Sequence, residues 1–248
     1  MLVRDNQHQS PLPKLEEINS SLQSLQFWAQ ASESPNDLGE KYALNYQQWV
    51  DLLGREAQMT AAQKPANLAV LLGDSISLWF PQHLLPSEHA WLNQGISGET
   101  SSGLLRRLHL LDSTQPEIIY IMIGINDVLK GVGNNTIIAN QELIVRYLKR
   151  RHPQTKIVLQ SILPHSGERA TWEGRDRLLE IPNERIQKLN QRLQGIANRE
   201  GVIYLDLYSL FADDQGKLRM DLSTDGLHLN WEGYRLWQIA IKISSQLN

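Results

Sequence analysis

The chain has 248 residues, of which 41% are hydrophobic, and its 24 basic and 27 acidic side chains give a formal net charge of −3. This size and composition predict one soluble globular domain, with or without an appendage, and the mild acidity gives no reason to expect nucleic acid as a partner. The chain contains no cysteine, which excludes a disulfide framework, a thiolate nucleophile and a cysteine-ligated zinc site.

The first 65 residues differ from the rest in charge and in pattern. They carry the whole net charge, because residues 66–248 hold 19 basic and 19 acidic residues. Apolar residues recur at helical spacing from Ile18 to Trp28 and again from Tyr42 to Ala57. We therefore expect residues 1–65 to form a helical extension that packs on the main domain. A dimer contact or a flap over the active site is the alternative.

The chain shows no targeting or membrane signal. No apolar h-region opens the sequence, and no apolar run approaches the roughly 18–20 residues that a membrane helix requires. These features predict a cytoplasmic protein without stable membrane insertion. They leave the formation of a homo-oligomer open.

From residue 66 onward, short apolar runs alternate with helical patterns. The runs that predict strands are Leu68–Leu72, Ala90–Leu92, Ile118–Ile123, Lys156–Ile162 and Val202–Leu205. The stretches that predict helices are Ser101–Leu111, Thr136–Arg151, Asn183–Arg199 and Trp231–Leu247. This alternation predicts an α/β fold of three layers, α/β/α, in which helices cover both faces of a central five-stranded parallel sheet.

Small and titratable residues follow the predicted strands, where an open parallel sheet binds its ligands. After the first strand comes Gly73-Asp74-Ser75, which places a serine hydroxyl near the start of a helix. The segment is not a G-x-S-x-G elbow, because position 77 is a serine. Ser75 is therefore a candidate nucleophile, and capping of the next helix is the structural alternative.

Asp225 and His228 form a D-x-x-H segment in the loop before the last helix. A histidine is the usual general base for a serine, and a carboxylate fixes its tautomer and stabilises the imidazolium. His228 has an acid nearby in a glycine-containing loop at a strand end. A partly buried histidine with no catalytic role is the alternative.

Gly98 and Asn126 follow the second and third predicted strands. Acyl transfer needs hydrogen-bond donors aimed at a developing oxyanion. A glycine in a tight loop offers an unobstructed backbone N–H, and an asparagine amide is a neutral donor of fixed direction. Taken singly, each residue could equally belong to a turn or a helix cap.

Together and in this order, the four segments resemble the SGNH (GDSL-type) hydrolase superfamily, over about residues 66–248. The matching segments are Gly73–Ser77, Asn93–Thr100, Gly124–Asp127 and Asp225–Leu229. The stretches GISGET and DGLHLNWEGY are most similar to the branch with platelet-activating-factor acetylhydrolase subunits and small bacterial esterases. The resemblance implies a flavodoxin-like fold, Ser75 as nucleophile, Asp225 and His228 as the other triad members, and Gly98 and Asn126 as oxyanion donors.

The resulting functional hypothesis is a serine ester hydrolase that acts through an acyl-enzyme on Ser75, with no metal or organic cofactor. The expected partner is a small-molecule ester with a short or medium acyl group, and lysophospholipid is a further candidate. We expect the pocket to be lined by Leu78, Trp79 and Phe80 after the serine, and by the loop from His165 to Trp172. A carbohydrate acetylesterase, a thioesterase and acyl transfer to an alcohol would use the same triad.

Two other classes compete with this hypothesis. Asp74, Asp127, Asp225 and His228 could serve as ligands of a divalent ion in a metal-dependent hydrolase. That hypothesis leaves the glycine and asparagine segments unexplained. A binding module that keeps the fold without turnover is the other competitor, since fold alone does not imply activity.

Overall fold

The computed structural model describes residues 44–245. The helix predicted at Ile18–Trp28 lies outside the described residues. Residues Asn45–Asn248 make up one compact unit. Helix α2 (Tyr46–Gln63) belongs to this unit, although the sequence places it in the N-terminal extension.

The centre of the fold is a five-stranded sheet in which every neighbouring pair of strands is parallel. The strands lie in the order β2-β1-β3-β4-β5. Their bounds are β1 (Leu68–Gly73), β2 (Ala90–Gly95), β3 (Ile118–Met122), β4 (Lys156–Gln160) and β5 (Ile203–Leu205). The three-layer α/β/α fold with a central five-stranded parallel sheet is therefore confirmed.

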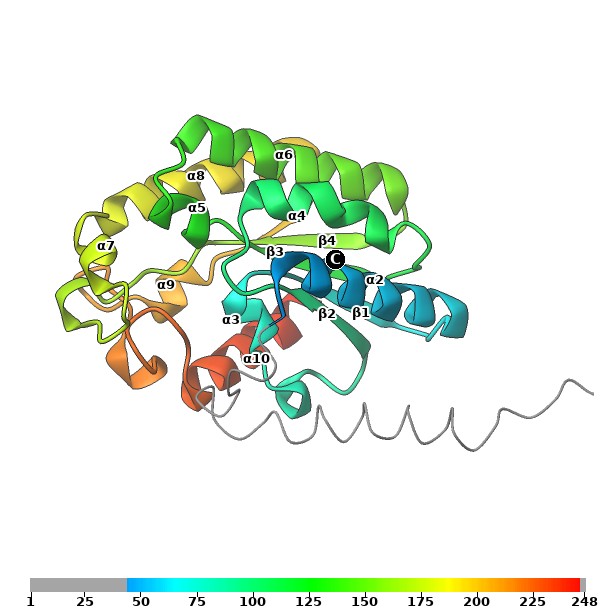
Figure 1. The fold of residues 1–248 in the computed structure, drawn as a ribbon, viewed down its shortest axis with the longest axis horizontal. Helices are drawn as coiled ribbons and strands as arrows, with labels where there is room; N and C mark the ends of the chain where they lie inside the picture. The colour runs from blue at the N-terminus through cyan, green and yellow to red at the C-terminus, as the bar shows by residue number, and fades with distance from the viewer. Residues whose placement is uncertain (1–43, 246–248) are drawn as a thin grey trace, which may run out of the picture. The chain divides into compact units, whose positions relative to one another are not determined.

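Helices cover both faces of the sheet, so its strands are apolar on both sides. In β1, Val70 and Leu72 pack into the core on one face, and Ala69 and Leu71 into the core on the other. Helices α4 (Ser101–Arg107), α6 (Asn134–Arg151) and α8 (Asn183–Glu200) lie along the first face, and α3 (Ser75–Leu78) and α10 (Trp231–Ser245) along the second (Figure 1). The apolar side of α2 joins the first core through Ala57.

Helices α6, α8 and α10 begin and end close to the predicted positions, whereas α3, α5 (Ile125–Leu129), α7 (Arg175–Leu179) and α9 (Tyr208–Phe211) lie outside the stretches predicted to be helical. Gly201 ends α8 in the left-handed conformation, as glycine after a helix commonly does. Asn230 accepts a hydrogen bond from the Gly233 amide at the start of α10.

Helix α2 runs on to Gln63 beyond the predicted Ala57, β4 ends at Gln160 before the predicted Ile162, and two more elements differ from the sequence prediction. The helix predicted over Ser101–Leu111 changes to a 3₁₀ helix after Arg107. Both helix types bury the same leucines at steps of three and four residues, so periodicity does not separate them. Strand β2 runs on to Gly95 beyond the predicted Leu92, because the polar side chains of Asn93 and Gln94 hydrogen-bond backbone carbonyls of neighbouring elements.

The strand order marks where a ligand would bind. The chain passes from β1 to β2 on one side and then returns to β3 on the other side of β1. At such a switch point the loops at the carboxyl ends of the two strands diverge and leave a crevice. Ser75 follows β1 and Asn126 follows β3, so both lie at this position. In the part of the chain that the structure describes, no helix is long and apolar enough to cross a membrane.

Candidate active site

The turn between β1 and α3 presents Ser75. Asp74 caps α3, because one of its carboxylate oxygens accepts the backbone N–H of Ile76 at 3.1 Å. Ser75 is then the first residue of the helix, and only 5% of its surface is exposed. Tight packing of this turn on β2 needs a glycine at position 95, where a Cβ atom would lie 2.4 Å from the Leu78 nitrogen.

Ser75, His228 and Asp225 form a continuous hydrogen-bonded series. The Ser75 Oγ lies 3.2 Å from His228 Nε2, and His228 Nδ1 lies 2.7 Å from Asp225 Oδ2. Since Nδ1 faces a carboxylate, it is the nitrogen that carries the proton in the neutral ring. Nε2 is then free to accept the serine hydroxyl hydrogen, as a general base must.

The other oxygen of Asp225 accepts the backbone N–H groups of Leu227 and His228, at 3.0 and 2.8 Å. Burial of Asp225 would raise its pKa, but these bonds and the one from the His228 ring together lower it below the usual value. Asp225 is therefore a carboxylate at neutral pH and can stabilise a protonated His228.

A second loop supports the backbone of this segment. The Asp225 carbonyl accepts the N–H groups of Thr171 and Trp172 at 2.8 and 3.0 Å, and the Gly226 carbonyl accepts that of Ser166 at 2.8 Å. Gly226 has a φ of +87°, and a Cβ atom there would lie 2.6 Å from Ala170. Only glycine fits this position without strain.

Two amide donors lie at the neighbouring strand ends without partners. Within residues 44–245, no hydrogen-bond partner exists for the backbone N–H of Gly98, whose carbonyl accepts Lys130 Nζ at 2.8 Å. The Asn126 side-chain nitrogen is buried and also has no partner in this range. A buried donor without a partner costs free energy, so the Asn126 nitrogen calls for a functional explanation, whereas the exposed Gly98 N–H is open to water.

A buried carboxylate connects the elements that carry these two donors. Asp127, next to Asn126 on α5, accepts both the backbone N–H and the hydroxyl of Ser101, at 2.7 and 2.6 Å. Ser101 begins α4, directly after the Gly98 loop. Burial raises the pKa of Asp127, against the opposing effect of the Ser101 hydrogen bonds. Sequence reasoning missed this pair, because no local pattern joins residues that meet only in the fold.

The residues predicted to line the pocket differ in their surroundings. The Trp79 ring lies against His228, with ring centroids 4.5 Å apart, and both Leu78 and Trp79 are half-buried. Trp172 is half-buried and belongs to the loop that supports Asp225. Phe80, in contrast, is 4% exposed and packs against Tyr234 and Trp237 in the core, so its predicted place in the pocket is wrong.

His165 is buried, and both of its ring nitrogens bond to the protein. Nε2 donates to the Ile181 carbonyl at 2.8 Å, and Nδ1 accepts the Gly167 N–H at 3.1 Å. Burial lowers its pKa, so the ring is neutral at physiological pH. The structure thus gives His165 a structural role in the loop and leaves no ring nitrogen to bind a substrate.

The residues considered as metal ligands do not gather into a ligand set. Asp225 and His228 bond to each other, Asp127 bonds to Ser101, and Asp74 caps α3. Among residues 44–245, no group of three or more His, Asp or Glu side chains could hold an ion. The described side chains therefore do not favour the metal-dependent hydrolase.

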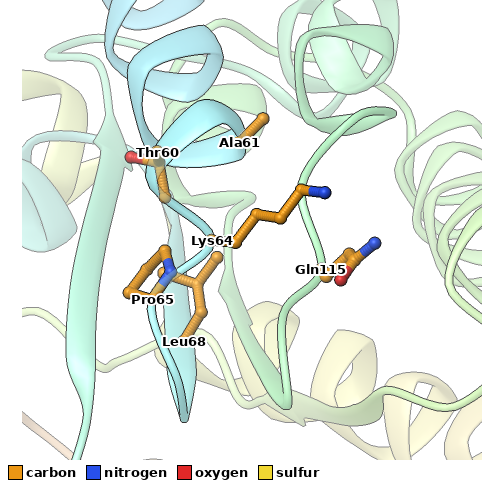
Figure 2. Close-up of a pocket in the computed structure, with 6 residues that line it drawn as sticks. All are labelled: Thr60, Ala61, Lys64, Pro65, Leu68 and Gln115. Carbon is orange, nitrogen blue, oxygen red and sulfur yellow. The ribbon is translucent and has the colours of Figure 1, made fainter. Parts of the chain in front are cut away.

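A small hollow lies where β1 begins (Figure 2), and Ser75 follows the other end of this strand. Its lining residues are Thr60, Ala61, Lys64, Pro65, Leu68 and Gln115. Its volume of about 50 Å³ is far below the roughly 300–1,000 Å³ of ordinary ligand pockets. The hollow is therefore not a candidate substrate site.

A hydrogen-bonded series of serine, histidine and carboxylate groups is an arrangement that enzymes of acyl transfer share. The model of the GDSL-like lipase/acylhydrolase family matches residues 71–236, and the chain belongs to this family. It is a carboxylic ester hydrolase of the α/β type.

Curated relatives include a platelet-activating factor acetylhydrolase IB subunit alpha2 from Rattus norvegicus. It is 29% identical over 179 residues, which are 66% of this chain and 70% of that protein. An arylesterase from Vibrio mimicus is 26% identical over 129 residues, which are 45% of this chain and 63% of that protein.

Solved structures show the same fold. A protein from Streptococcus pneumonia described as a platelet activating factor is 26% identical, with a TM-score of 0.72 over 91% of this chain and 98% of that one. A GDSL-like lipase from Bacteroides thetaiotaomicron has a TM-score of 0.65 over 79% and 97% of the two chains. At 23% identity, the second likeness concerns the fold alone.

Proposed function

We propose that the protein is a serine esterase that hydrolyses carboxylic esters of short or medium acyl chains through an acyl-enzyme on Ser75. The observation that carries this proposal is the hydrogen-bonded series from the Ser75 hydroxyl through His228 to Asp225. The unpartnered Asn126 amide supports it, because a buried donor with no partner in the described protein can serve an oxyanion instead.

The first half of the reaction forms the acyl-enzyme. Ser75 Oγ attacks the ester carbonyl carbon while His228 Nε2 takes the hydroxyl proton, and the carbonyl π electrons move to oxygen. The oxyanion accepts hydrogen bonds from the N–H groups of Gly98 and Ser75 and from the Asn126 amide. When the tetrahedral intermediate collapses, the bond to the alcohol oxygen breaks and His228 returns its proton to the leaving alkoxide.

The second half uses water in the same way. His228 Nε2 removes a proton from water as the water oxygen attacks the acyl carbonyl carbon. The oxyanion forms again at the same donors, and its collapse breaks the bond to Ser75 Oγ. The serine regains its proton from His228, and the carboxylic acid leaves. Asp225 stays ionised throughout and stabilises the imidazolium in both halves.

The choice of a short or medium acyl group rests on the surroundings of the triad and on the relatives. Leu78 and Trp79 are half-buried apolar side chains one turn beyond the serine, and Trp79 contacts the His228 ring. The relatives are named as an acetylhydrolase subunit and an arylesterase. Both names denote enzymes that act on acyl esters.

A panel of p-nitrophenyl esters from acetyl to palmitoyl, beside acetylated sugars and lysophospholipid, tests this function. We expect the largest kcat/KM for a short or medium acyl chain. Ser75→Ala should lower kcat by about 10⁴–10⁶, and Asn126→Ala by about 10²–10³. Asn135→Ala, an exposed exchange on α6, is the control and should leave kcat unchanged. Unchanged turnover in Ser75→Ala would show that Ser75 is not the nucleophile.

A further inference from the structure

A buried ion pair joins the loop that carries Gly98 to helix α4. Arg107 Nε lies 2.8 Å from Glu99 Oε2, and each of the two residues is only 3% exposed. Removing two charges from water is costly, so a buried pair persists only where further hydrogen bonds satisfy both groups. The bonds around this pair therefore show what it holds in place.

The ion pair fixes the chain on both sides of Gly98. After the glycine, Glu99 Oε1 accepts the backbone N–H of Thr100 at 3.1 Å. Before it, Arg107 Nη2 donates to the backbone carbonyl of Gln94, on β2, at 2.8 Å. The loop from Gln94 to Thr100 is thus held at both ends by one pair of charges.

Helix α2 contacts the same two ends of the loop. Its first residue, Tyr46, donates its hydroxyl to Glu99 Oε2 at 3.3 Å. Further toward the C-terminus of α2, the Leu53 carbonyl accepts the side-chain amide of Gln94 at 3.2 Å. Gln94 and Leu53 are almost fully buried, which fixes α2 against β2.

Gly103 on α4 leaves the space that the side chains of Glu99 and Tyr46 occupy. A Cβ atom at Gly103 would lie 1.7 Å from Glu99 Oε1 and 3.2 Å from the Tyr46 hydroxyl. Any larger residue at position 103 would therefore displace the carboxylate from its place. The absence of a side chain at Gly103 leaves room for the Glu99 carboxylate to contact both Arg107 and Tyr46 of α2.

We propose that Tyr46 and Glu99 are positioning residues of the esterase, which hold the Gly98 N–H where the oxyanion forms. Helix α2 is on this account part of the active-site scaffold. The inference rests on the proposed function, because it needs Gly98 to be an oxyanion donor. Such donors must lie 2.7–3.1 Å from the oxyanion, so a displacement of a few tenths of an ångström weakens transition-state binding.

The test compares two tyrosines that each donate a hydroxyl to a carboxylate. Tyr46→Phe removes the bond to Glu99. Tyr147→Phe removes a similar bond to Asp112, at 2.8 Å, on α6 and away from the strand ends that carry the site. With p-nitrophenyl acetate, we expect Tyr46→Phe to lower kcat about 3- to 10-fold at unchanged KM. Tyr147→Phe should keep the kcat of the unaltered enzyme.

Glu99→Gln gives a second measurement, because it keeps the shape and removes the charge. We expect it to lower kcat more than Tyr46→Phe does, measured well below the Tm of each variant. A purely structural role would lower Tm and leave the kcat of the folded enzyme unchanged. Unchanged kcat in Tyr46→Phe and Glu99→Gln would overturn the inference, as would an equal loss in Tyr147→Phe.

Ser75→Ala, assayed in parallel, separates the two hypotheses. If Ser75→Ala retains turnover, the proposed function fails, and with it the role of Gly98. If Ser75→Ala is inactive while Tyr46→Phe and Glu99→Gln match the unaltered enzyme, the esterase stands and only the positioning role fails. Loss of kcat in all three, with Tyr147→Phe unaffected, supports both.

Discussion

Two carboxylic acids interact with His228, and the protein shifts their pKa values in opposite directions. Burial alone would raise the pKa of Asp225, but hydrogen bonds from the His228 ring and from two backbone N–H groups lower it. Burial raises the pKa of Asp74 to about 7, although the Ile76 N–H and His228 act against the rise. Near neutral pH, Asp225 is therefore an anion and Asp74 is partly protonated.

This difference predicts unequal effects of the same exchange at the two positions. Asp225→Asn should lower kcat by about 10⁴, because an amide favours the wrong tautomer of the histidine, as in other serine hydrolases. Asp74→Asn should lower kcat by less than about 10-fold, since an asparagine caps a helix nearly as well as an aspartate. Steady-state kinetics with p-nitrophenyl acetate, on variants of matched circular dichroism, would compare them. Similar losses would contradict these separate roles.

At the scale of single residues, the sequence predicts that Ser75, Asp225 and His228 meet, and the oxyanion roles of Gly98 and Asn126 stay predictions. Ser75, Gly98, Asn126, Asp225 and His228 stand in short segments after apolar runs, and the structure places His228 within hydrogen-bonding distance of both Ser75 and Asp225. The pKa values of Asp225 and Asp74 depend in addition on how deeply the folded chain buries each carboxyl group. No local pattern gives those quantities.

The loop of residues 223–229 acts as one structural element with the loop of residues 165–172. Three backbone hydrogen bonds join the two loops at Asp225 and Gly226. Gly226 lies so close to Ala170 that a side chain has no room. The orientation of Asp225 and His228 therefore depends on how closely the loops pack.

Gly226→Ala tests this dependence, with Gly201→Ala as the matched control. Both glycines have positive φ, but a Cβ atom at Gly201 would have no neighbour within 4 Å. The control should lose about 1–2 kcal/mol of stability through backbone strain and keep its kcat. Gly226→Ala should lose more stability and about 10-fold or more in kcat, because the triad shifts. Thermal unfolding and esterase kinetics measure both, and equal behaviour of the two variants would refute the role of the packing.

Elements were predictable where apolar periodicity alone decides them. The strands β1 and β3 and the helices α6, α8 and α10 begin and end near the expected residues. Strand β2 was harder, because Asn93 and Gln94 read as polar although both lie in the strand and bond to other elements. Side-chain bonds across the fold are not visible in a single sequence.

At the scale of the described unit, α2 packs against the sheet. The helix buries Leu53 and Ala57 and supplies a carbonyl to Gln94. Glu56 lies on the same helix, half-buried, and burial raises its pKa to about 7. A carboxyl group that is ionised and half-buried weakens the docking of α2.

This arrangement predicts how stability depends on pH. Glu56 has a folded pKa of about 7 and a usual value of 4.5, so between these pH values the folded chain holds a proton that the unfolded chain releases. The contribution of Glu56 to stability therefore falls as pH rises from about 4.5 to 7, and its full cost is present above pH 7.

Glu56→Gln removes this charge. It should stabilise the protein at pH 8 by about 1–2 kcal/mol, or roughly 2–8 °C in Tm, because the neutral amide avoids burying an anion. At pH 4.5 its effect should be small, since Glu56 is then protonated when folded. Asp51→Asn, an exposed exchange on the same helix, should change stability by less than about 0.5 kcal/mol at either pH. A gain for Glu56→Gln that is equal at both pH values would show that burial of the charge does not govern the docking of α2.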